Sequence, residues 1–520
     1  MSVIASPQPM QQRRKMFVVR PQTAGLKMDQ DTVTTDPHYC VVDSNWNFYN
    51  GETRKRPGQT AINASVLGSA STYIMGTHRF RLEDGTVSQI ACTPTRVYSL
   101  NSSGVATDRT STVFTGGNTD LFTYCVANDE VIITNGVDTM RRWDGVTATE
   151  SAISGSGAPS AAKYVESYID RIFAARTTES GTLYPRRVRW SNNASNTTWN
   201  GTSAGFADLN DSEGWIIGIR RLKEAIVVYK EDSIIVGRST GIASAPVTFN
   251  QRAGAHGCIS GHTVADVGNF HIFLGRDNVY LFDLVEPIPI GDPIREELFS
   301  TTDFDKMQYS HAFIKDDRRE YWLWVTPTGE SVPTRAWCYN WKDQTWSRHS
   351  WSAGIISSGR YASGDTITWD DITDTWDSYA SRWDDSTSLA FTPYIALGGT
   401  VGVLYYMNTS AASDAGTAID ASLETGDIDF GLPGYYKTIT AIRVMNHNIG
   451  QTNMSLAYST NGASFTEATT TYTPGTDRHS TVSAFPIATG EQFRFRIRNS
   501  QAAAAAFIAL EVDYVQRGRV

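Results

Sequence analysis

Short apolar runs separated by turn residues fill the middle of the chain, and residues 163–240 show this pattern most clearly. The runs 168–175, 187–191, 214–219 and 225–230 are rich in β-branched or aromatic residues, and Gly, Asn, Asp or Ser bound them. Each run has about the length of one strand and is too short for a typical helix, and the flanking residues supply turn geometry. The pattern predicts consecutive antiparallel hairpins with no helix between them.

Similar pairs of runs recur on both sides of this region. They are 88–92 with 96–100, 121–126 with 130–134, 271–275 with 278–283, and 320–325 with 337–341. The shared order is an apolar strand, a turn, a second strand that ends in an aromatic residue, and then an acidic or amide residue. A spacing of roughly 40–50 residues is that of propeller blades, so the sequence predicts an all-β protein built on a β-propeller of meandering antiparallel blades.

Several of these runs also carry a resemblance to a known family. The residues that carry it are Asp170-Arg171-Ile172-Phe173, the run 184–191, Trp199, the run 214–218, the run 227–230 with 233–234, and the run 275–282. In these residues the chain resembles the β-propeller tail proteins of short-tailed bacteriophages. The similarity covers most of residues 30–410 and is spread out rather than concentrated in one motif.

The resemblance implies a structural protein of the virion, the nozzle or hub of the tail. It implies a homohexameric ring at the distal end of the head–tail connector, through which the genomic DNA passes during ejection. It further implies contacts with portal or adaptor proteins and with tail fibres or spikes. The expected location is therefore the tail of the virion, after synthesis in the host cytoplasm.

The composition changes after Trp383, beyond which no Trp follows although the chain has 14. The runs 436–444, 454–459, 492–498 and 508–515 alternate apolar and polar residues, which predicts strands with one buried face. We therefore expect a basic N-terminal arm at 1–28, the propeller at 29–410, a small-residue linker at 411–425 and a C-terminal antiparallel β-sandwich at 426–520. Residues 30–80 are expected to complete the last blade by pairing with strands near 390–407.

The arm at residues 1–28 is basic and contains no acidic residue, and its candidate contact residues are Arg13, Arg14, Lys15 and Arg20. Two interpretations stay open. One is a solvated tail, and the other is an arm that becomes ordered when it docks on an acidic neighbouring subunit.

A Trp-Asp repeat occupies residues 365–388, where Trp369, Trp376 and Trp383 follow one another at an interval of seven and each precedes an Asp. One apolar position per heptad leaves no coiled-coil seam, so we expect successive tight turns in which each Trp fills a slot on the propeller or on a neighbouring subunit. The carboxylates lack the spacing of a calcium loop. Acids beside exposed Trp rings also describe a glycosidase cleft, so that interpretation stays open.

Net charge, cysteine spacing and hydropathy indicate which interactions to expect with nucleic acid, metals and membranes. The formal net charge of −9 predicts a surface that repels nucleic acid, so DNA is expected to pass without specific binding. The 5 cysteines are far apart and show no metal-ligand spacing, so buried free thiols are expected. No apolar run is long enough for a membrane span or a secretion signal.

The chain lacks the motifs of a nucleophile elbow, a phosphate-binding loop or a zinc protease. His78, His271, His311 and His349 stand alone and are expected to be surface or core residues. His256, Cys258 and His262 lack a further ligand at zinc spacing. No catalytic, cofactor or metal site is therefore predicted, and the protein is expected not to be an enzyme.

Two other function classes remain. The alternative hypothesis is a glycan-binding or glycan-hydrolysing propeller for host-surface recognition, since the hairpin around Asn461-Gly462 resembles the Asp-box turn of sialidase-like propellers. A cytosolic scaffold of the WD-repeat kind is disfavoured, because the Trp-Asp pairs cluster in one loop instead of closing each blade.

Overall fold

The structure is a computed structural model that describes residues 14–361, 394–408, 411–447, 454–469 and 479–519. Strands dominate it. The helical elements are α1 (Arg295–Thr301) and the short 3-10 helices η1 (Pro21–Thr23), η2 (Gly261–Thr263), η3 (Asp292–Ile294) and η4 (Phe304–Tyr309). The chain divides into two compact units: unit 1 comprises residues 1–57, 342–349 and 410–520, and unit 2 comprises 58–341 and 350–409.

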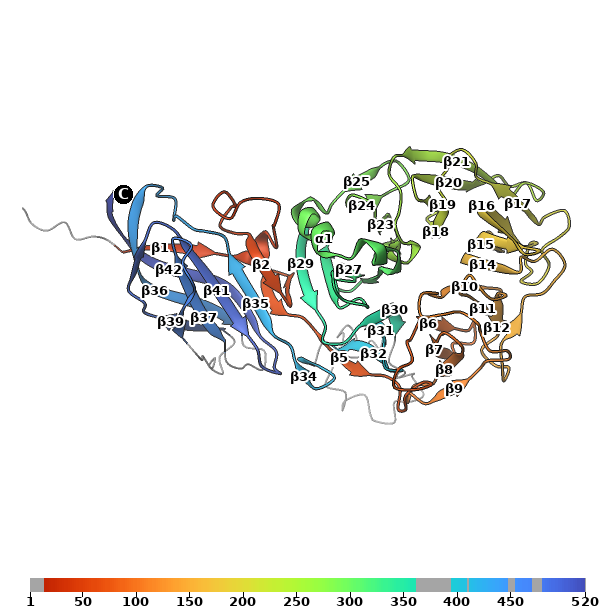
Figure 1. Ribbon diagram of the computed structural model, residues 1–520, viewed down its shortest axis with the longest axis horizontal. Coiled ribbons are helices and arrows are strands. Elements are labelled where there is room, and N and C mark those ends of the chain that lie inside the picture. Colours follow the sequence, from red (N-terminus) through yellow and green to blue (C-terminus); the bar gives the residue numbers. More distant parts are fainter. Residues whose placement is uncertain (1–13, 362–393, 409–410, 448–453, 470–478, 520) are drawn as a thin grey trace, which may run out of the picture. The chain divides into compact units, whose positions relative to one another are not determined.

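Antiparallel sheets follow one another around a ring in unit 2, and we number them as blades 1 to 7 (Figure 1). Blade 1 holds β6 (Gly76–Arg81), β7 (Val87–Cys92), β8 (Val97–Leu100) and β9 (Ala106–Asp108); blade 2 holds β10 (Thr123–Ala127), β11 (Glu130–Thr134), β12 (Arg141–Trp143) and β13 (Ser151–Ala152). Blade 3 holds β14 (Ala161–Tyr168), β15 (Arg171–Glu179), β16 (Thr182–Trp190) and β17 (Gly205–Asp208); blade 4 holds β18 (Ile216–Leu222), β19 (Ala225–Lys230), β20 (Ser233–Ser239) and β21 (Val247–Gly254).

The remaining blades complete the ring. Blade 5 holds β22 (Ala265–Asp266), β23 (His271–Leu274), β24 (Val279–Phe282) and β25 (Pro287–Pro289), and blade 6 includes β26 (His311–Lys315), β27 (Glu320–Val325) and β28 (Arg335–Asn340). Blade 7 holds β30 (Ile355–Tyr361), β31 (Tyr394–Gly399), β32 (Leu404–Asn408) and β5 (Gly58–Ala61). The predicted all-β propeller is confirmed.

Two-residue turns produce the meander of hairpins that the sequence predicts for residues 163–240. Tyr168 pairs with Arg171 across Ile169 and Asp170, whose φ values are 46° and 54°. Positive φ at both central residues is the signature of the turn whose twist matches the flanking strands. The prediction of consecutive antiparallel strands in this region is confirmed.

A strand from the N-terminal side closes the ring. In blade 7, Thr60 of β5 pairs with Tyr406 of β32, and Gln59 pairs with Met407. This is the predicted pairing between residues 30–80 and strands near 390–407. Since a closed ring leaves no free sheet edge between its first and last blades, the closure protects backbone groups that would otherwise stay unpaired.

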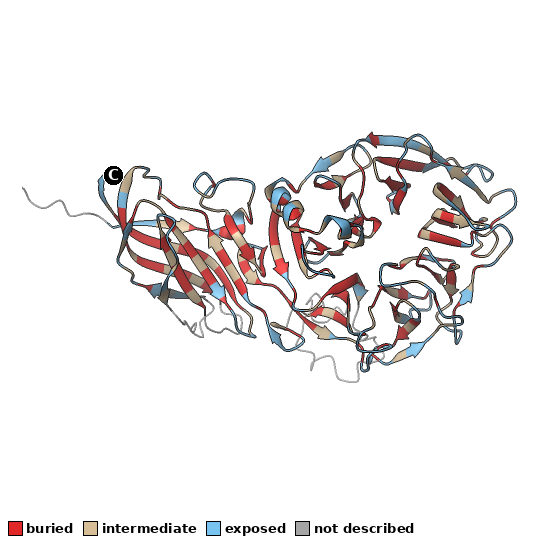
Figure 2. Cartoon of the chain, viewed as in Figure 1, coloured by how far each residue is buried: buried red, intermediate tan, exposed pale blue. Residues whose placement is uncertain are grey.

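The hydrophobic cores lie between neighbouring blades. Between blades 3 and 4, for example, Phe173 and Trp190 pack in one cluster with Ile219, Ile226 and Val228. Figure 2 shows buried residues concentrated on the strands of each sheet. Because each core is shared by two sheets, a blade depends on both neighbours for its burial.

Unit 1 contains two antiparallel sheets. The seven-stranded sheet holds β1 (Lys15–Val19), β3 (Trp46–Tyr49), β4 (Glu52–Lys55), β36 (Tyr435–His447), β39 (His479–Ala484), β40 (Ala488–Gly490) and β42 (Ala506–Arg519). The five-stranded sheet holds β2 (Cys40–Ser44), β35 (Ala421–Thr425), β37 (Ser455–Thr460), β38 (Thr466–Thr469) and β41 (Phe493–Asn499). The short strands β33 (Ser413–Asp414) and β34 (Thr417–Ala418) pair with each other, and β29 (Thr345–Ser350) falls mostly within unit 1.

The alternation predicted for the C-terminal strands is present: Phe493, Phe495 and Ile497 are buried on one face of β41. The ring of Phe430 lies 5.6 Å from that of Phe493 and 4.5 Å from that of Tyr514, so it contacts a strand of each sheet. The sandwich architecture expected for residues 426–520 stays a prediction.

The units do not follow the predicted boundaries of 29–410 and 426–520. Asp43 of β2 pairs with Leu423 of β35, and Phe17 of β1 pairs with Val512 of β42, so the N-terminal strands belong to unit 1. These pairings join residues from opposite ends of the chain. Local periodicity carries no information about such partners, and for this reason the sequence pattern placed residues 29–57 in the propeller.

Candidate functional site

The first strand of every blade lines the central channel of the propeller. A cavity of about 610 Å³ occupies the channel, and its wall draws on β6, β10, β14, β18, β22, β26 and β30. A second cavity, of about 670 Å³, lies where several of these strands begin, and Leu121 and His262 line both. We call them the channel cavity and the entry cavity. Concave sites of this size are those that take small ligands.

Close backbone contacts hold the inner strands around the channel. A Cβ atom at Gly218 would lie 2.9 Å from the Cα of Gly261, and one at Gly359 would lie 2.4 Å from the carbonyl oxygen of Thr77. Only glycine permits such approaches. These positions therefore fix how closely blade 4 meets blade 5 and how closely blade 7 meets blade 1.

Each pair of neighbouring blades is also joined by a hydrogen bond between a side chain of one and the backbone of the other. The bonds are Glu83 N to Asp129 Oδ1 (3.0 Å), Thr123 Oγ1 to Lys163 O (3.0 Å), Tyr168 Oη to Glu224 O (2.7 Å), His271 Nε2 to Arg221 O (3.0 Å), Ser260 Oγ to Ser310 O (2.7 Å), His311 Nε2 to Ile355 O (3.0 Å) and Ser357 Oγ to Ile74 O (2.7 Å). Hydrogen bonds thus join every pair of neighbouring blades around the ring.

The histidines of this ring act as neutral hydrogen-bonding groups. His271 donates from Nε2 to the Arg221 carbonyl, and its Nδ1 accepts from the Tyr229 hydroxyl at 2.8 Å. Burial lowers the pKa of His271 to about 4 and that of His311 to about 3. These residues were expected to be surface or core histidines, and both are buried in the core.

Charged side chains line the channel cavity. Arg220 Nη1 lies 3.6 Å from Glu166 Oε2, which links blades 3 and 4, and Arg360 Nη2 donates to Asp316 Oδ2 at 2.6 Å. Burial raises the pKa of Glu166. Arg79 also lines the cavity, but its side chain makes no hydrogen bond or ion pair within the described part of the chain.

The entry cavity combines an aromatic ring with charges of both signs. Trp215 is 40% exposed, and the guanidinium carbon of Arg176 lies 4.7 Å from its ring centroid. Lys163 Nζ lies 3.8 Å from Asp120 Oδ1, and Glu231 and Asp305 are further acidic residues of the wall. An exposed indole beside hydrogen-bonding groups is suited to stacking against a flat or ring-shaped ligand.

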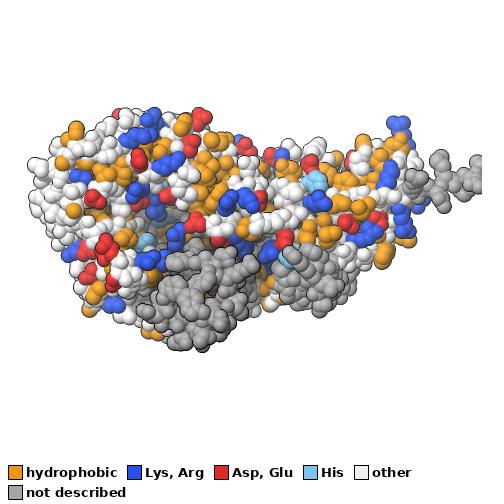
Figure 3. Space-filling model, turned by 180° about the vertical axis from the view of Figure 1, so that it is seen from behind, with side chains coloured by type: hydrophobic (Ala, Val, Ile, Leu, Met, Phe, Trp, Pro, Cys, Tyr) orange, Lys and Arg blue, Asp and Glu red, His pale blue; other side chains and the backbone are white. Residues whose placement is uncertain are grey.

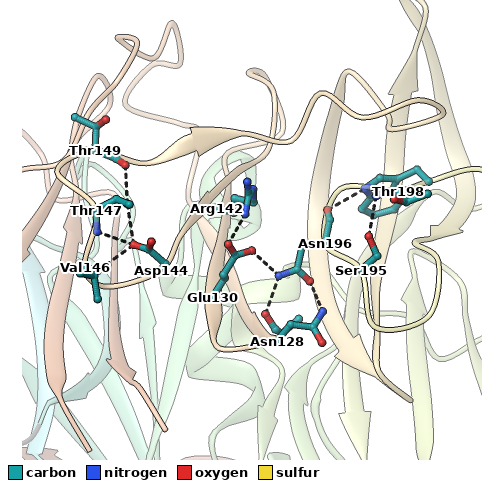
Figure 4. Close-up of polar contacts among 12 residues, drawn as sticks. Asn128, Glu130, Arg142, Asp144, Val146, Thr147, Thr149, Ser195, Asn196 and Thr198 are labelled. Atoms are coloured by element: carbon teal, nitrogen blue, oxygen red, sulfur yellow. Dashed lines mark hydrogen bonds and ion pairs between the residues drawn. The ribbon is translucent and has the colours of Figure 1, made fainter. Parts of the chain in front are cut away.

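The residues that carry the family resemblance have structural roles. Trp199 is fully buried, and its Nε1 donates to the Asn196 carbonyl at 3.2 Å. Asn196 in turn bonds Glu130 Oε2 at 2.6 Å and accepts from Asn128 Nδ2 at 2.7 Å (Figure 4). This network joins the loop after β16 to blade 2, so it connects two neighbouring blades.

A second network in Figure 4 explains the aromatic-acidic cadence of the sequence. Asp144 follows Trp143 at the end of β12, and its Oδ1 accepts from the backbone N–H groups of Val146 (3.0 Å) and Thr147 (2.7 Å). The Trp143 indole donates to the Thr147 carbonyl at 2.9 Å. The acidic residue shapes the turn, and the turn holds the buried ring in place.

No group of three potential metal ligands is present in the part of the chain that the structure describes. Cys258 is buried and its Sγ lies 3.1 Å from the Ser260 carbonyl oxygen, and burial raises the pKa of its thiol to about 12. His256 packs against the ring of Tyr280 at 5.1 Å. All 5 cysteines are free and buried, as the sequence predicts.

The predicted assembly residues are only partly described. Arg13, Trp369, Trp376 and Trp383 lie outside the described residues. The other three are Arg14, Lys15 and Arg20, which are exposed in unit 1. Lys15 belongs to β1, pairs with Tyr514 of the chain's own β42, and donates from Nζ to Gln516 Oε1 at 3.3 Å.

Part of the predicted arm is therefore a strand within its own chain. The sequence pattern did not indicate the charged wall of the channel either, because the residues facing it come from all blades. The alternation of Arg79, Phe80 and Arg81 on β6 was the available signal, but it does not show which residues line the channel.

Comparisons with known proteins found distant similarity to solved structures. The sequence matches no protein-family model and no curated protein. Among solved structures, the Neurospora crassa Pan2 WD40 domain matches at 10% identity over 70% of this chain and 97% of that chain, with a TM-score of 0.35. The structure of YCF48 bound to D1 peptide matches at 9% identity over 68% and 98%, with a TM-score of 0.37.

An exo-beta-1,3-galactanase from Phanerochaete chrysosporium, solved with galactose, matches at 10% identity over 86% of this chain and 99% of that chain, with a TM-score of 0.27. At these identities and scores none of the matches carries an inference about activity or partners. Among the described residues, no helix is long and apolar enough to cross a membrane.

Proposed function

We propose that the protein is a structural component of a short-tailed bacteriophage tail, in which copies of the chain form a nozzle or hub ring around the DNA-exit channel. The ring would anchor to portal or adaptor proteins and to fibres or spikes, and genomic DNA would pass through its lumen without specific binding. In Figure 3 acidic and basic side chains are interspersed over one face of the molecule. Mixed charges of this kind suit a wall past which DNA slides.

An exposed apolar loop in unit 1 carries this proposal. Phe485 and Ile487 are 75% and 85% exposed, in the connection between β39 and β40. Both strands pair with β36, so the loop leaves the edge of the seven-stranded sheet. Large exposed hydrophobic side chains at one place mark a surface that another protein covers. A neighbouring copy in the ring is the occupant that the proposal assigns to this loop.

The bonded inner ring of the propeller supports the same role. An assembly that transmits load and keeps a fixed bore needs rigid subunits, and closed cyclic symmetry needs the same two surfaces on every copy. Seven sheets joined at every interface by hydrogen bonds meet the first requirement.

The test is the mass of the purified protein and its electron-microscope class averages, alone and mixed with tail particles that lack it. Six-fold rings with a central hole support the proposal. The double variant Phe485→Ser/Ile487→Ser is expected to remove ring formation while leaving the propeller folded. Val146→Ser is the matched control, because Val146 is 77% exposed but lies between β12 and β13 of blade 2. Protein that stays monomeric and does not bind the particles would refute the proposal.

The entry cavity favours a second candidate, glycan binding at the host surface. The exposed indole of Trp215 stands beside Arg176, Asp120 and Glu231 on the cavity wall. Stacking of a sugar ring on an indole with carboxylates nearby is a common way to hold a glycan. Oligosaccharide binding that disappears in Trp215→Ala would support this candidate, and no binding at millimolar sugar would exclude it.

A further inference from the structure

Three arginines gather where β6 and β30 end, and we call them the arginine cluster: Arg79, Arg81 and Arg360. The two strands touch at the residues just before the cluster, since a Cβ at Gly359 would lie 2.4 Å from the Thr77 carbonyl oxygen. Arg79 and Arg81 are two positions apart on β6, so their side chains leave the same face of that strand. Arg79 and Arg360 both line the channel cavity.

The carboxylates nearby compensate only part of this cluster. Asp266, which also lines the cavity, accepts from the backbone N–H of Gly268 at 2.6 Å. Asp316 is bonded to Arg360 at 2.6 Å, and Glu166 is paired with Arg220 at 3.6 Å. The side chain of Arg79 makes no hydrogen bond or ion pair in the described part of the chain, and its Nε is buried. A half-buried guanidinium with no acceptor is unusual, because an unsatisfied buried donor destabilises the folded state.

Electrostatics point in the same direction. The pKa of Arg79 is lowered, first by burial and then by the like charges of Arg81 and Arg360. Burial, Arg220 and Arg360 together lower the pKa of the neighbouring His78 to about 4. Like charges therefore act on both Arg79 and His78 at this end of the cavity.

His78 supplies a second unsatisfied group. Its Nε2 is buried and has no hydrogen-bond partner among the described residues, while its ring stacks on Tyr124 with centroids 5.3 Å apart and an interplanar angle of 15°. His78 lines the same cavity as Arg79. His78 and Arg79 both line this cavity and each has a buried nitrogen without a partner among the described residues, which is what a site for a polar ligand presents.

We propose that the channel cavity binds a small organic oxyanion, whose phosphate or carboxylate head lies between Arg79 and Arg360 with His78 beside it. The planar guanidinium fork matches the paired oxygens of such a head. Phe122, Phe313 and Ile314 line the rest of the wall and would cover a compact apolar body. The volume of about 610 Å³ is that of a small-molecule site. The proposal does not depend on the tail function.

The experiment measures binding to the full chain by calorimetry and by the thermal midpoint, with inorganic phosphate, phenyl phosphate and benzoate as probes. Sodium chloride at matched ionic strength corrects for screening. We expect saturable binding of at least one probe, a midpoint that rises with probe concentration, and at least a roughly tenfold loss of affinity in Arg79→Gln. Phenyl phosphate is expected to bind more tightly than phosphate, and comparison with benzoate identifies the preferred head.

Arg238→Gln is the matched control, because Arg238 is an exposed arginine on β20 that does not line the cavity. It is expected to bind each probe as the wild type does. Arg360→Gln gives an independent second variant if Arg79→Gln does not fold. Absence of saturable binding by the wild type, or equal affinity in wild type and Arg79→Gln, would overturn the proposal.

Discussion

The buried imidazole of His311 should make the propeller sensitive to acid. It is 3% exposed, donates from Nε2 to the Ile355 carbonyl at 3.0 Å and has Ser358 Oγ 3.3 Å from Nδ1. Both ring nitrogens thus have partners in the neutral form. Burial lowers its pKa to about 3, whereas an unfolded histidine has a pKa of about 6.5.

The sign follows from proton binding. Below pH 6.5 the unfolded chain takes up a proton at His311 that the folded chain does not. The stabilisation of the fold by neutral His311 is therefore fully present above pH 6.5 and is lost as the pH falls from 6.5 toward 3. One pKa unit corresponds to about 1.4 kcal/mol, so His311 alone should remove about 2 kcal/mol of unfolding free energy between pH 7.5 and pH 5. At pH 5 this figure depends on the unfolded pKa alone, provided that the folded value stays below about 4.

The assay is urea unfolding at pH 7.5, 6 and 5, followed by the fluorescence of the tryptophans. Trp324 is a suitable reporter because its ring centroid lies 5.3 Å from that of His311. Between pH 7.5 and pH 5, the free energy of unfolding of His311→Gln should fall by about 2 kcal/mol less than that of the wild type. Ser358→Ala is the control, since it removes the neighbour of Nδ1 but leaves the imidazole to titrate. If His311→Gln and the wild type lose the same free energy over this range, the reasoning is wrong.

Three substitutions test the packing of the two units. Gly218→Ala should lower the free energy of unfolding by about 1–3 kcal/mol through overpacking, because its Cβ would lie 2.9 Å from the Cα of Gly261; an unchanged urea midpoint would contradict this. Tyr321→Phe removes the hydroxyl that donates to the buried Thr263 carbonyl at 2.9 Å, so thermal unfolding should report a loss of about 1–3 kcal/mol; a loss below 0.5 kcal/mol would argue that water replaces the bond. Arg56→Met leaves a buried aspartate of unit 1 without its cation and should cost about 3–5 kcal/mol, measured by hydrogen exchange of that unit; exchange at the wild-type rate would refute it.

Local patterns predicted the blades well, because a hairpin is decided within some twenty residues. The turn at Ile169 and Asp170 and the strands that flank it illustrate this, and the buried face of β41 followed from the alternation of Phe493 with Arg494. The ring closure by β5 was also expected, since an incomplete last blade needs a strand from outside its own region.

The unit boundaries and the channel were harder to predict. Asp43 and Leu423 are partners although nothing near either residue specifies the other. Arg79 and Arg360 meet because the first and last blades are neighbours, and this depends on the number of blades. Sequence periodicity gives the faces of a strand but does not give that number.

The closure of the ring by β5 also has a consequence for synthesis. Residue 61, at the end of β5, leaves the ribosome long before residue 404, where its partner β32 begins. At about 5–20 residues per second, the delay is roughly 20–70 seconds. During that time β5 has no partner in β32, and blade 1 lacks one of its two neighbours. The early strands are thus exposed to neighbouring nascent chains, and slower elongation or a shortage of chaperones should reduce the yield of this protein more than that of one whose first strands pair locally.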